Sequence, residues 1–198
     1  MAPVYDRGGT RFDPLRRRAI DLLRLRVGET VIDAGCGTGL SLRLLLEAVG
    51  SEGRIIGIDQ SPEMLARARE KVQAEGWQNV TLIQAPVEDA EIPAEADAAL
   101  FALSHDIMRT PAALQNVVQY VKGGGRVAVV GTKWAPWWAL PVNLRLWYTC
   151  RRGMTTYEAL GRPWSHLERL VPSLRVVDRV FLGWPGEYYL AWGVVSGT

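Results

Sequence analysis

The chain has 198 residues, 48% of them hydrophobic and 22% charged, with a formal net charge of +2. This length buries one good core and hardly two, so we expect a single domain over residues 1–198. The small net charge gives no reason to expect a nucleic acid as partner. Two cysteines are too few for a disulfide framework or a thiolate metal site.

The sequence predicts a cytoplasmic protein, either a monomer or a homodimer. Residues 1–13 lack the apolar core of a secretory signal. No apolar stretch approaches the roughly 20 residues of a membrane span. The one dense basic run, Arg16 to Arg18, lies in an amphipathic pattern and is interpreted as a solvated helix face.

Strand and helix patterns alternate from the first strand onward. Strands are expected at 30–34, 54–59, 79–84, 98–103 and 126–130, and helices at 40–49, 62–76 and 111–120. The helix at 62–76 has the clearest start, because Ser61 is a good cap and Pro62 follows it. Gly123 to Gly125 is interpreted as a helix stop before the fifth strand. This alternation predicts an α/β fold, a doubly wound parallel sheet with helices on both faces.

After residue 170 the pattern changes to two β-rich runs, 175–182 and 188–195. The segment Gly-Trp-Pro-Gly joins them and predicts a hairpin turn. A C-terminal antiparallel hairpin is therefore expected to close the mostly parallel sheet.

A glycine-rich loop follows the first strand in the run VIDAGCGTG, residues 31–39. Gly35 and Gly37 let the backbone approach a ligand that a side chain would block. Asp33, at the strand end, can order the loop amides or reach a ligand's ammonium group through water. Asp59 ends the second strand, where a carboxylate can accept both ribose hydroxyls. The pattern predicts an adenosyl ligand held by an amino-acid tail, which is S-adenosylmethionine (SAM).

A dinucleotide site is the competing interpretation of the same glycines. Its fingerprint is GxGxxG, whereas here Leu40 follows Gly39 and leaves GxGxG. Asp33 would also be out of place beside a pyrophosphate, and too little chain remains for a substrate domain. The SAM interpretation is therefore preferred.

With these features, residues 27 to about 132 resemble the class I SAM-dependent methyltransferases of the small-molecule type. The resemblance implies a seven-stranded sheet with the last strand antiparallel, SAM as cofactor and S-adenosylhomocysteine as product. It implies these contacts: Asp33, Gly35, Cys36 and Gly37 around the methionine moiety; Asp59 on the ribose; Gln60 and Met64 beside adenine; Val87 and Glu88 at the adenine edge; Phe101 and Ala102 under the methionine amine; and Tyr5 folded over the cofactor. Pro86 departs from the family pattern, since many members carry an acid there.

A proton acceptor is needed when the methylated group is a hydroxyl or a protonated amine. His105, just past the fourth strand, is the candidate general base. The alternative is that Ser104 or Asp106 caps the following turn and His105 only packs there. His166 is a weaker candidate for the same role.

Seven of the eight tryptophans lie after residue 133. Residues 134–170 are therefore predicted to be a substrate-lid insertion after the fifth strand. For its aromatic part, 134–152, three interpretations stay open: a lid lining an apolar acceptor pocket, an interfacial membrane patch, or a core helix with a dimer contact.

We therefore expect methyl transfer to a small hydrophobic acceptor, at an oxygen, nitrogen or carbon atom. Two alternatives remain at this point. One is a SAM-binding partner protein without catalytic activity, and the other is a membrane-associated lipid or quinone methyltransferase.

Overall fold

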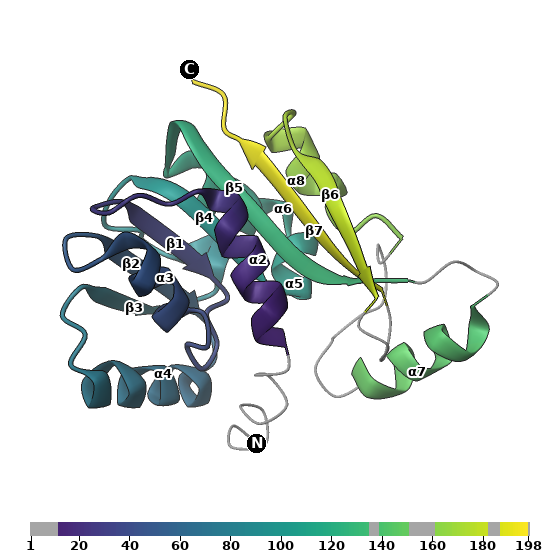
Figure 1. Cartoon of the computed structure of the whole chain (residues 1–198), viewed down its shortest axis with the longest axis horizontal. Coiled ribbons are helices and arrows are strands. Elements are labelled where there is room, and N and C mark those ends of the chain that lie inside the picture. Colours follow the sequence, from purple (N-terminus) through teal and green to yellow (C-terminus); the bar gives the residue numbers. More distant parts are fainter. Residues whose placement is uncertain (1–11, 135–138, 151–160, 182–186, 198) are drawn as a thin grey trace.

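The computed structural model describes residues 12–134, 139–150, 161–181 and 187–197. Its seven strands form one sheet of order β3-β2-β1-β4-β5-β7-β6 (Figure 1). The strands are β1 Thr30–Ala34, β2 Arg54–Asp59, β3 Val80–Gln84, β4 Ala96–Ala102, β5 Val121–Lys133, β6 Arg175–Phe181 and β7 Glu187–Val194. Within this described sheet β7 is antiparallel to both β5 and β6, so it points opposite to the other six strands. The predicted fold class is confirmed.

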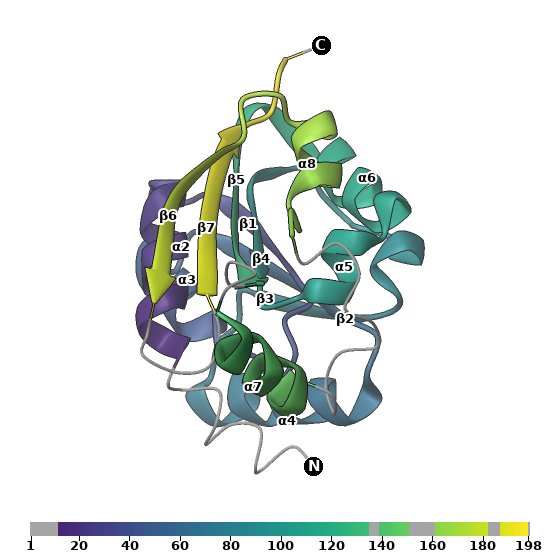
Figure 2. The ribbon, with the colours of Figure 1, turned by 90° about the vertical axis from the view of Figure 1, so that its right-hand side faces the viewer.

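Helices cover both faces of the sheet (Figure 2). One layer holds α2 (Asp13–Leu23), α3 (Leu42–Val49) and α4 (Pro62–Glu75). The other holds the short 3-10 helix η2 (Val87–Asp89) with α5 (His105–Arg109), α6 (Pro111–Gln119) and α8 (Ser165–Leu170). A further helix, α7 (Leu140–Cys150), stands outside both layers, beyond the end of β5. Every helix in the described ranges is too short or too polar to cross a bilayer.

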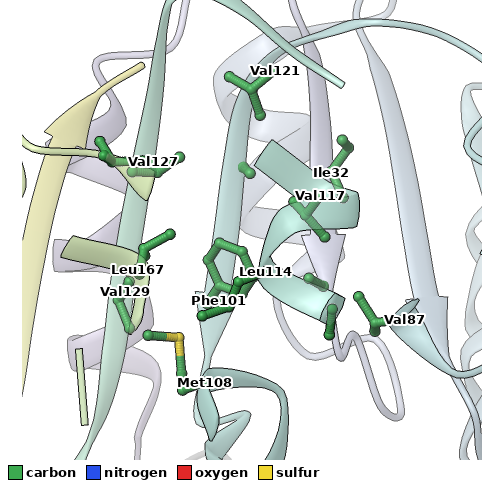
Figure 3. Packing of buried hydrophobic residues seen from close by; sticks show 14 of the residues in the cluster. Ile32, Val87, Phe101, Met108, Leu114, Val117, Val121, Val127, Val129 and Leu167 are labelled. Atoms are coloured by element: carbon green, nitrogen blue, oxygen red, sulfur yellow. The ribbon is translucent and has the colours of Figure 1, made fainter. Parts of the chain in front are cut away.

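Successive side chains along a strand point to opposite faces of the sheet, so the buried residues form two cores, one on each face. Val31 of β1 faces the core under α2 and α3, while its neighbour Ile32 faces the opposite core. In that second core Phe101 packs with Leu114 of α6 and Leu167 of α8 (Figure 3). Each such buried side chain contributes about 1.5–3 kcal/mol, so packing on both faces holds the sheet rigid.

The first two strands match their predicted bounds, and α4 begins as predicted. The Met64 N–H donates to the Ser61 hydroxyl at 3.3 Å, which makes Ser61 the cap of this helix. The capping hydroxyl of Ser61 thus determines where the helix after β2 begins.

The prediction for Gly123 to Gly125 is wrong, because these residues lie inside β5 rather than before it. The Gly124 N–H donates to the carbonyl of Val195 at 2.9 Å, and the Val195 N–H donates to the carbonyl of Gly125 at 2.8 Å. A partner 70 residues away in the sequence therefore extends the strand, and no local signal reports it.

The segment predicted to be a lid divides into two kinds of structure. Trp164, just before α8, and Leu167 within it are buried in the core beside β7. The Trp164 and Tyr189 rings lie 5.0 Å apart between centroids. Of the described residues in 134–170, α7 is the part that stands outside the helix layers, and its lid role stays a prediction.

Candidate cofactor site and active site

The carboxyl ends of β1, β2 and β4 meet at one edge of the sheet. Ala34 of β1 pairs with Ile58 of β2, and Asp33 pairs with Leu100 of β4. The chain order reverses between β1 and β4, and ligands of open α/β sheets bind at such a switch point. The loops that leave these three strands therefore form the candidate site (Figure 1).

The glycine loop is locked onto the second strand by backbone hydrogen bonds. The N–H groups of Gly35 and Cys36 donate to the carbonyl of Ile58 at 2.8 and 3.0 Å. Asp59 accepts from the Gly37 N–H at Oδ2 and from the Ser61 N–H at Oδ1, each at 2.9 Å. A carboxylate oxygen has a further lone pair, so the Asp59 side chain can still accept hydrogen bonds from a ligand.

The glycines of the loop have different surroundings. A Cβ added to Gly35, where φ is +79°, would lie 2.7 Å from Ile107 Cδ1 and 2.9 Å from Ser104 Cβ. A side chain at position 35 would therefore collide with the connection between β4 and α5, which packs against this glycine. A Cβ at Gly37 would meet only Asp59 Oδ2, at 4.0 Å. Gly37 is therefore the position at which the loop backbone faces open space.

Two side chains expected around the methionine moiety point into the protein interior. The Cys36 side chain is buried with Leu65 and Ala68 of α4. Burial, and then the nearby carboxylates of Asp33 and Asp59, raise the pKa of its thiol, so no thiolate forms near neutral pH. Phe101 is fully buried in the second core (Figure 3). Both residues can offer a ligand only their backbone atoms, whereas the neighbouring Ala102 is half-buried.

Asp33 is fully buried, and neither carboxylate oxygen has a hydrogen-bond partner among the described residues. Burial raises the pKa of Asp33 to about 7, an effect that Arg16 opposes and Asp59 reinforces. An ionised carboxyl buried without a partner is costly, so this site favours a cationic ligand group. Asp33 does not order the loop amides: the N–H groups of Gly35 and Cys36 donate to the Ile58 carbonyl, and that of Gly37 donates to Asp59.

The prediction that Arg16 to Arg18 form a solvated helix face is wrong for Arg16. Arg17 and Arg18 are exposed, but Arg16 is only 4% exposed and donates to Asp13 Oδ1 at 2.9 Å. Helical spacing could have revealed this, because position 16 lies on the same stripe as the buried Ala19, Ile20 and Leu23. The positive charge of Arg16, on α2, acts on Asp33 and opposes the rise in its pKa.

The residues expected beside adenine lie in two loops at the same edge. Gln60 and Glu88 are exposed, Met64 is half-buried and Val87 is buried. Asn116 of α6, which sequence analysis missed, donates through Nδ2 to the carbonyls of Val87 at 2.7 Å and Ala90 at 2.9 Å. It thereby fixes η2, which carries Glu88. No motif marks such a residue in the sequence.

The end of β4 is strained. Leu103 has φ +58°, a left-handed conformation that costs a side-chain-bearing residue roughly 1–3 kcal/mol. Its N–H donates to the carbonyl of Val130 at 2.7 Å, which holds the bend. The bend places Ser104 against Gly35 and makes His105 the first residue of α5, half-buried. His166 lies on α8, which packs on α5 and α6.

Tyr5 lies outside the described residues, as do 135–138 and 151–152 of the aromatic segment. Among the described residues, no three histidine, cysteine or acidic side chains gather as a metal site would require.

The candidate site consists of three features: the Asp59 carboxylate that fixes the glycine loop, the buried Asp33 carboxyl and the open backbone at Gly37. The sheet order, the glycine loop and the two strand-end acids together define a Rossmann-like domain of the class I methyltransferase type.

Comparison with known proteins agrees with this class. Residues 31–125 match the family model described as a methyltransferase domain. An aklanonic acid methyltransferase of a Streptomyces species is 34% identical over 129 residues, 63% of this chain and 58% of its own length. A demethylmenaquinone methyltransferase of Listeria welshimeri is 29% identical over 147 residues, 67% of this chain and 59% of its own length. The chain thus spans less than two thirds of either relative.

A solved SAM-dependent methyltransferase from Aquifex aeolicus has the same fold. The two structures superpose with a TM-score of 0.65 at 21% identity, over 91% of this chain and 89% of the other. The matched methyltransferase-domain model and the named relatives support a class I SAM-dependent methyltransferase, as the resemblance predicted, and the solved structure shows the same fold. The methyl donor of this family is SAM.

Proposed function

We propose that the protein transfers the methyl group of SAM to a small hydrophobic acceptor. The observation that carries this proposal is the pair of acids at the edge of the sheet, Asp59 holding the loop and Asp33 buried without a partner. When bound, SAM supplies an electrophilic methyl carbon on a sulfonium centre whose leaving group is a neutral thioether. Little side-chain chemistry is then required beyond positioning the acceptor.

The residues present fit this ligand. Asp59 accepts two backbone N–H groups and retains lone pairs for the hydroxyls of a ribose. Asp33 is fully buried, so its carboxyl would reach the ammonium group of the amino-acid tail through water, and the ligand's positive charge would offset the cost of the buried carboxylate. At Gly37 the absence of a side chain leaves the loop open to the ligand.

The acceptor class is inferred from the relatives and from the far side of the site. By their names, the two relatives act on aklanonic acid and on demethylmenaquinone, both small molecules. The segment after β5 leads from this edge into α7, which exposes Leu140, Leu144 and Trp147. An exposed apolar helix that follows a strand ending at this edge of the sheet favours an apolar acceptor.

His105 is proposed to hold the proton that the acceptor loses. It begins α5 directly after Ser104, whose Cβ would lie 2.9 Å from a Cβ at Gly35. This contact brings the start of α5 to the glycine loop. An imidazole changes protonation near neutral pH and suits the role of a base there.

The test is mass spectrometry of quinones and aromatic acids after incubation with methyl-labelled SAM. Label is expected in at least one acceptor. Cofactor binding by calorimetry without label in any acceptor would instead indicate a SAM-binding protein that does not catalyse transfer. Failure to bind the cofactor would refute the proposal outright.

His105→Ala is expected to lower the turnover number about 100-fold or more and to remove the limb of the pH–rate profile that reports the base. His166→Ala is the matched control, since these are the two histidines of the chain. An unchanged pH profile in His105→Ala would exclude it as the base.

A further inference from the structure

The helix α7 carries a stripe of exposed apolar side chains. Leu140 is 69% exposed, Leu144 67%, Trp147 45% and Tyr148 60%. Their spacing places all four on one face of the helix. The other large hydrophobic residues exposed in the described chain, Val27, Leu170 and Val177, lie on separate elements. The α7 stripe is therefore a patch, whereas the others are isolated residues.

The helix is also set apart from the body of the protein. Figures 1 and 2 both show α7 beyond the end of β5, outside the sheet and its two helix layers. It follows Lys133 and Trp134 at the edge of the sheet that carries the candidate site. A surface pressed against α7 would thus lie beyond the carboxyl end of β5, the edge of the sheet at which β1, β2 and β4 also end.

The charge of this part of the chain is one-sided. From Trp134 to Tyr157 the sequence holds three basic residues, Arg145, Arg151 and Arg152, and no acidic one. Lys133, just before this stretch, is buried and donates to the carbonyl of Trp134, so it adds no charge to the surface. The whole chain is nearly balanced, with 23 basic and 21 acidic residues. A partner that covers the stripe should therefore be negatively charged as well as apolar.

A second copy of the chain fits these features poorly. A helix of 11 residues is about 16 Å long, and four side chains on one face expose a few hundred Å². A stable interface buries about 800 Å² on each partner. Two basic segments would also repel each other across a symmetric contact. An anionic bilayer has neither problem, since leucine, tryptophan and tyrosine suit its interface and arginine its headgroups.

We propose that α7 docks on the surface of an anionic membrane, with the stripe in the headgroup region. The apolar side chains enter the boundary with the acyl chains, and the positive charge of this stretch of sequence attracts it to the anionic headgroups. Where the proposed function also holds, the hydrophobic acceptor reaches the site from the lipid phase. That last step rests on the proposed function, whereas the docking does not.

Co-sedimentation with vesicles tests the docking. The protein is expected to bind vesicles of phosphatidylcholine with phosphatidylglycerol, and to bind pure phosphatidylcholine at least tenfold more weakly. Binding should fall as salt is raised. The double variant Leu144→Glu with Trp147→Glu is expected to lose at least tenfold in vesicle binding. Val27→Glu and Val177→Glu, which also charge exposed valines, should bind like the unmodified protein.

Several outcomes would overturn the inference. One is an unmodified protein that binds neither kind of vesicle. Another is a double variant that binds as well as the unmodified protein. A dimer in solution that the double variant abolishes would assign the stripe to a second copy. Unchanged vesicle binding with a raised KM for a detergent-dissolved acceptor would assign it to the acceptor pocket.

Two measurements separate this inference from the proposed function. Calorimetry with SAM on the double variant verifies that the fold and the cofactor site are intact. Methyl transfer to a detergent-dissolved acceptor without vesicle binding would overturn the docking and leave the function standing. Vesicle binding without transfer to any acceptor would do the reverse.

Discussion

The two sides of the sheet are held together in different ways. On the β1–β2 side, Asp59 bonds to Ser61, two positions away, and to Gly37, 22 positions away. On the β5–β7 side, Gly124 bonds to Val195, and Lys133 of β5 pairs with Glu187 of β7. The β1–β2 side, which we propose binds the cofactor (the cofactor side), is thus assembled by short connections. The β5–β7 side, which leads to the proposed acceptor segment (the acceptor side), is assembled by the return of the C-terminal strands. We infer that the cofactor side tolerates change least.

The largest effect is expected where the glycine loop touches the β4–α5 connection. Gly35→Ala adds a Cβ in a left-handed conformation and within 2.9 Å of Ser104 Cβ. The conformational cost and the overpacking together should lower the free energy of unfolding by about 2–5 kcal/mol, measured by urea denaturation. Gly76→Ala is the control, because its φ is also positive at +69° but nothing lies within 4 Å. Equal losses in both variants would contradict the packing argument.

Asp33 should make stability depend on pH. Its pKa is about 7 in the folded protein but 3.8 ordinarily. The unfolded chain therefore ionises first, and the folded state loses stability as pH rises from about 4 to 7. The loss is complete above pH 7 and amounts to roughly 4 kcal/mol at most. Urea denaturation across this range should show a flatter profile for Asp33→Asn, together with weaker SAM binding.

Asp21→Asn, at an exposed position of α2, is the control for that experiment. Its profile should follow that of the unmodified protein. Parallel profiles for the unmodified protein and Asp33→Asn would mean that the buried carboxyl does not titrate as described.

Gly131→Ala tests the acceptor side alone. A Cβ there would lie 2.8 Å from Tyr189 Cε1, and the Tyr189 ring packs against Trp164. Moving this ring should cost about 1–3 kcal/mol of stability. SAM affinity by calorimetry should change less than twofold, because the Asp59 contacts are not involved. A large loss of affinity would show that the two sides are not independent.

Asp59→Ala tests the cofactor side alone. It removes the acceptor for two backbone N–H groups and the proposed partner of the ribose. SAM should bind at least tenfold more weakly, about 1.4 kcal/mol. Calorimetry measures this, with Asp21→Ala as the control. Unchanged affinity in Asp59→Ala would refute the assignment of the ribose contact.

Local patterns determined much of this protein. The strand bounds of β1 and β2, the capped start of α4 and the two strand-end acids can all be read from the sequence. Each depends on contacts with near neighbours or on alternation along one strand. The alternation of strand and helix patterns was enough to predict the fold class, and the glycine loop with Asp59 predicted the ligand type.

Tertiary structure decided the rest, because the relevant partners are far apart in the chain. Only packing shows that Cys36 and Phe101 point inward and that Asn116 holds η2. Only the return of residue 195 makes Gly124 part of a strand. Arg16 looks solvated as one of three arginines and is buried once α2 packs on β4 and β5. A sequence reports its neighbours along the chain, whereas burial and charge depend on neighbours in space.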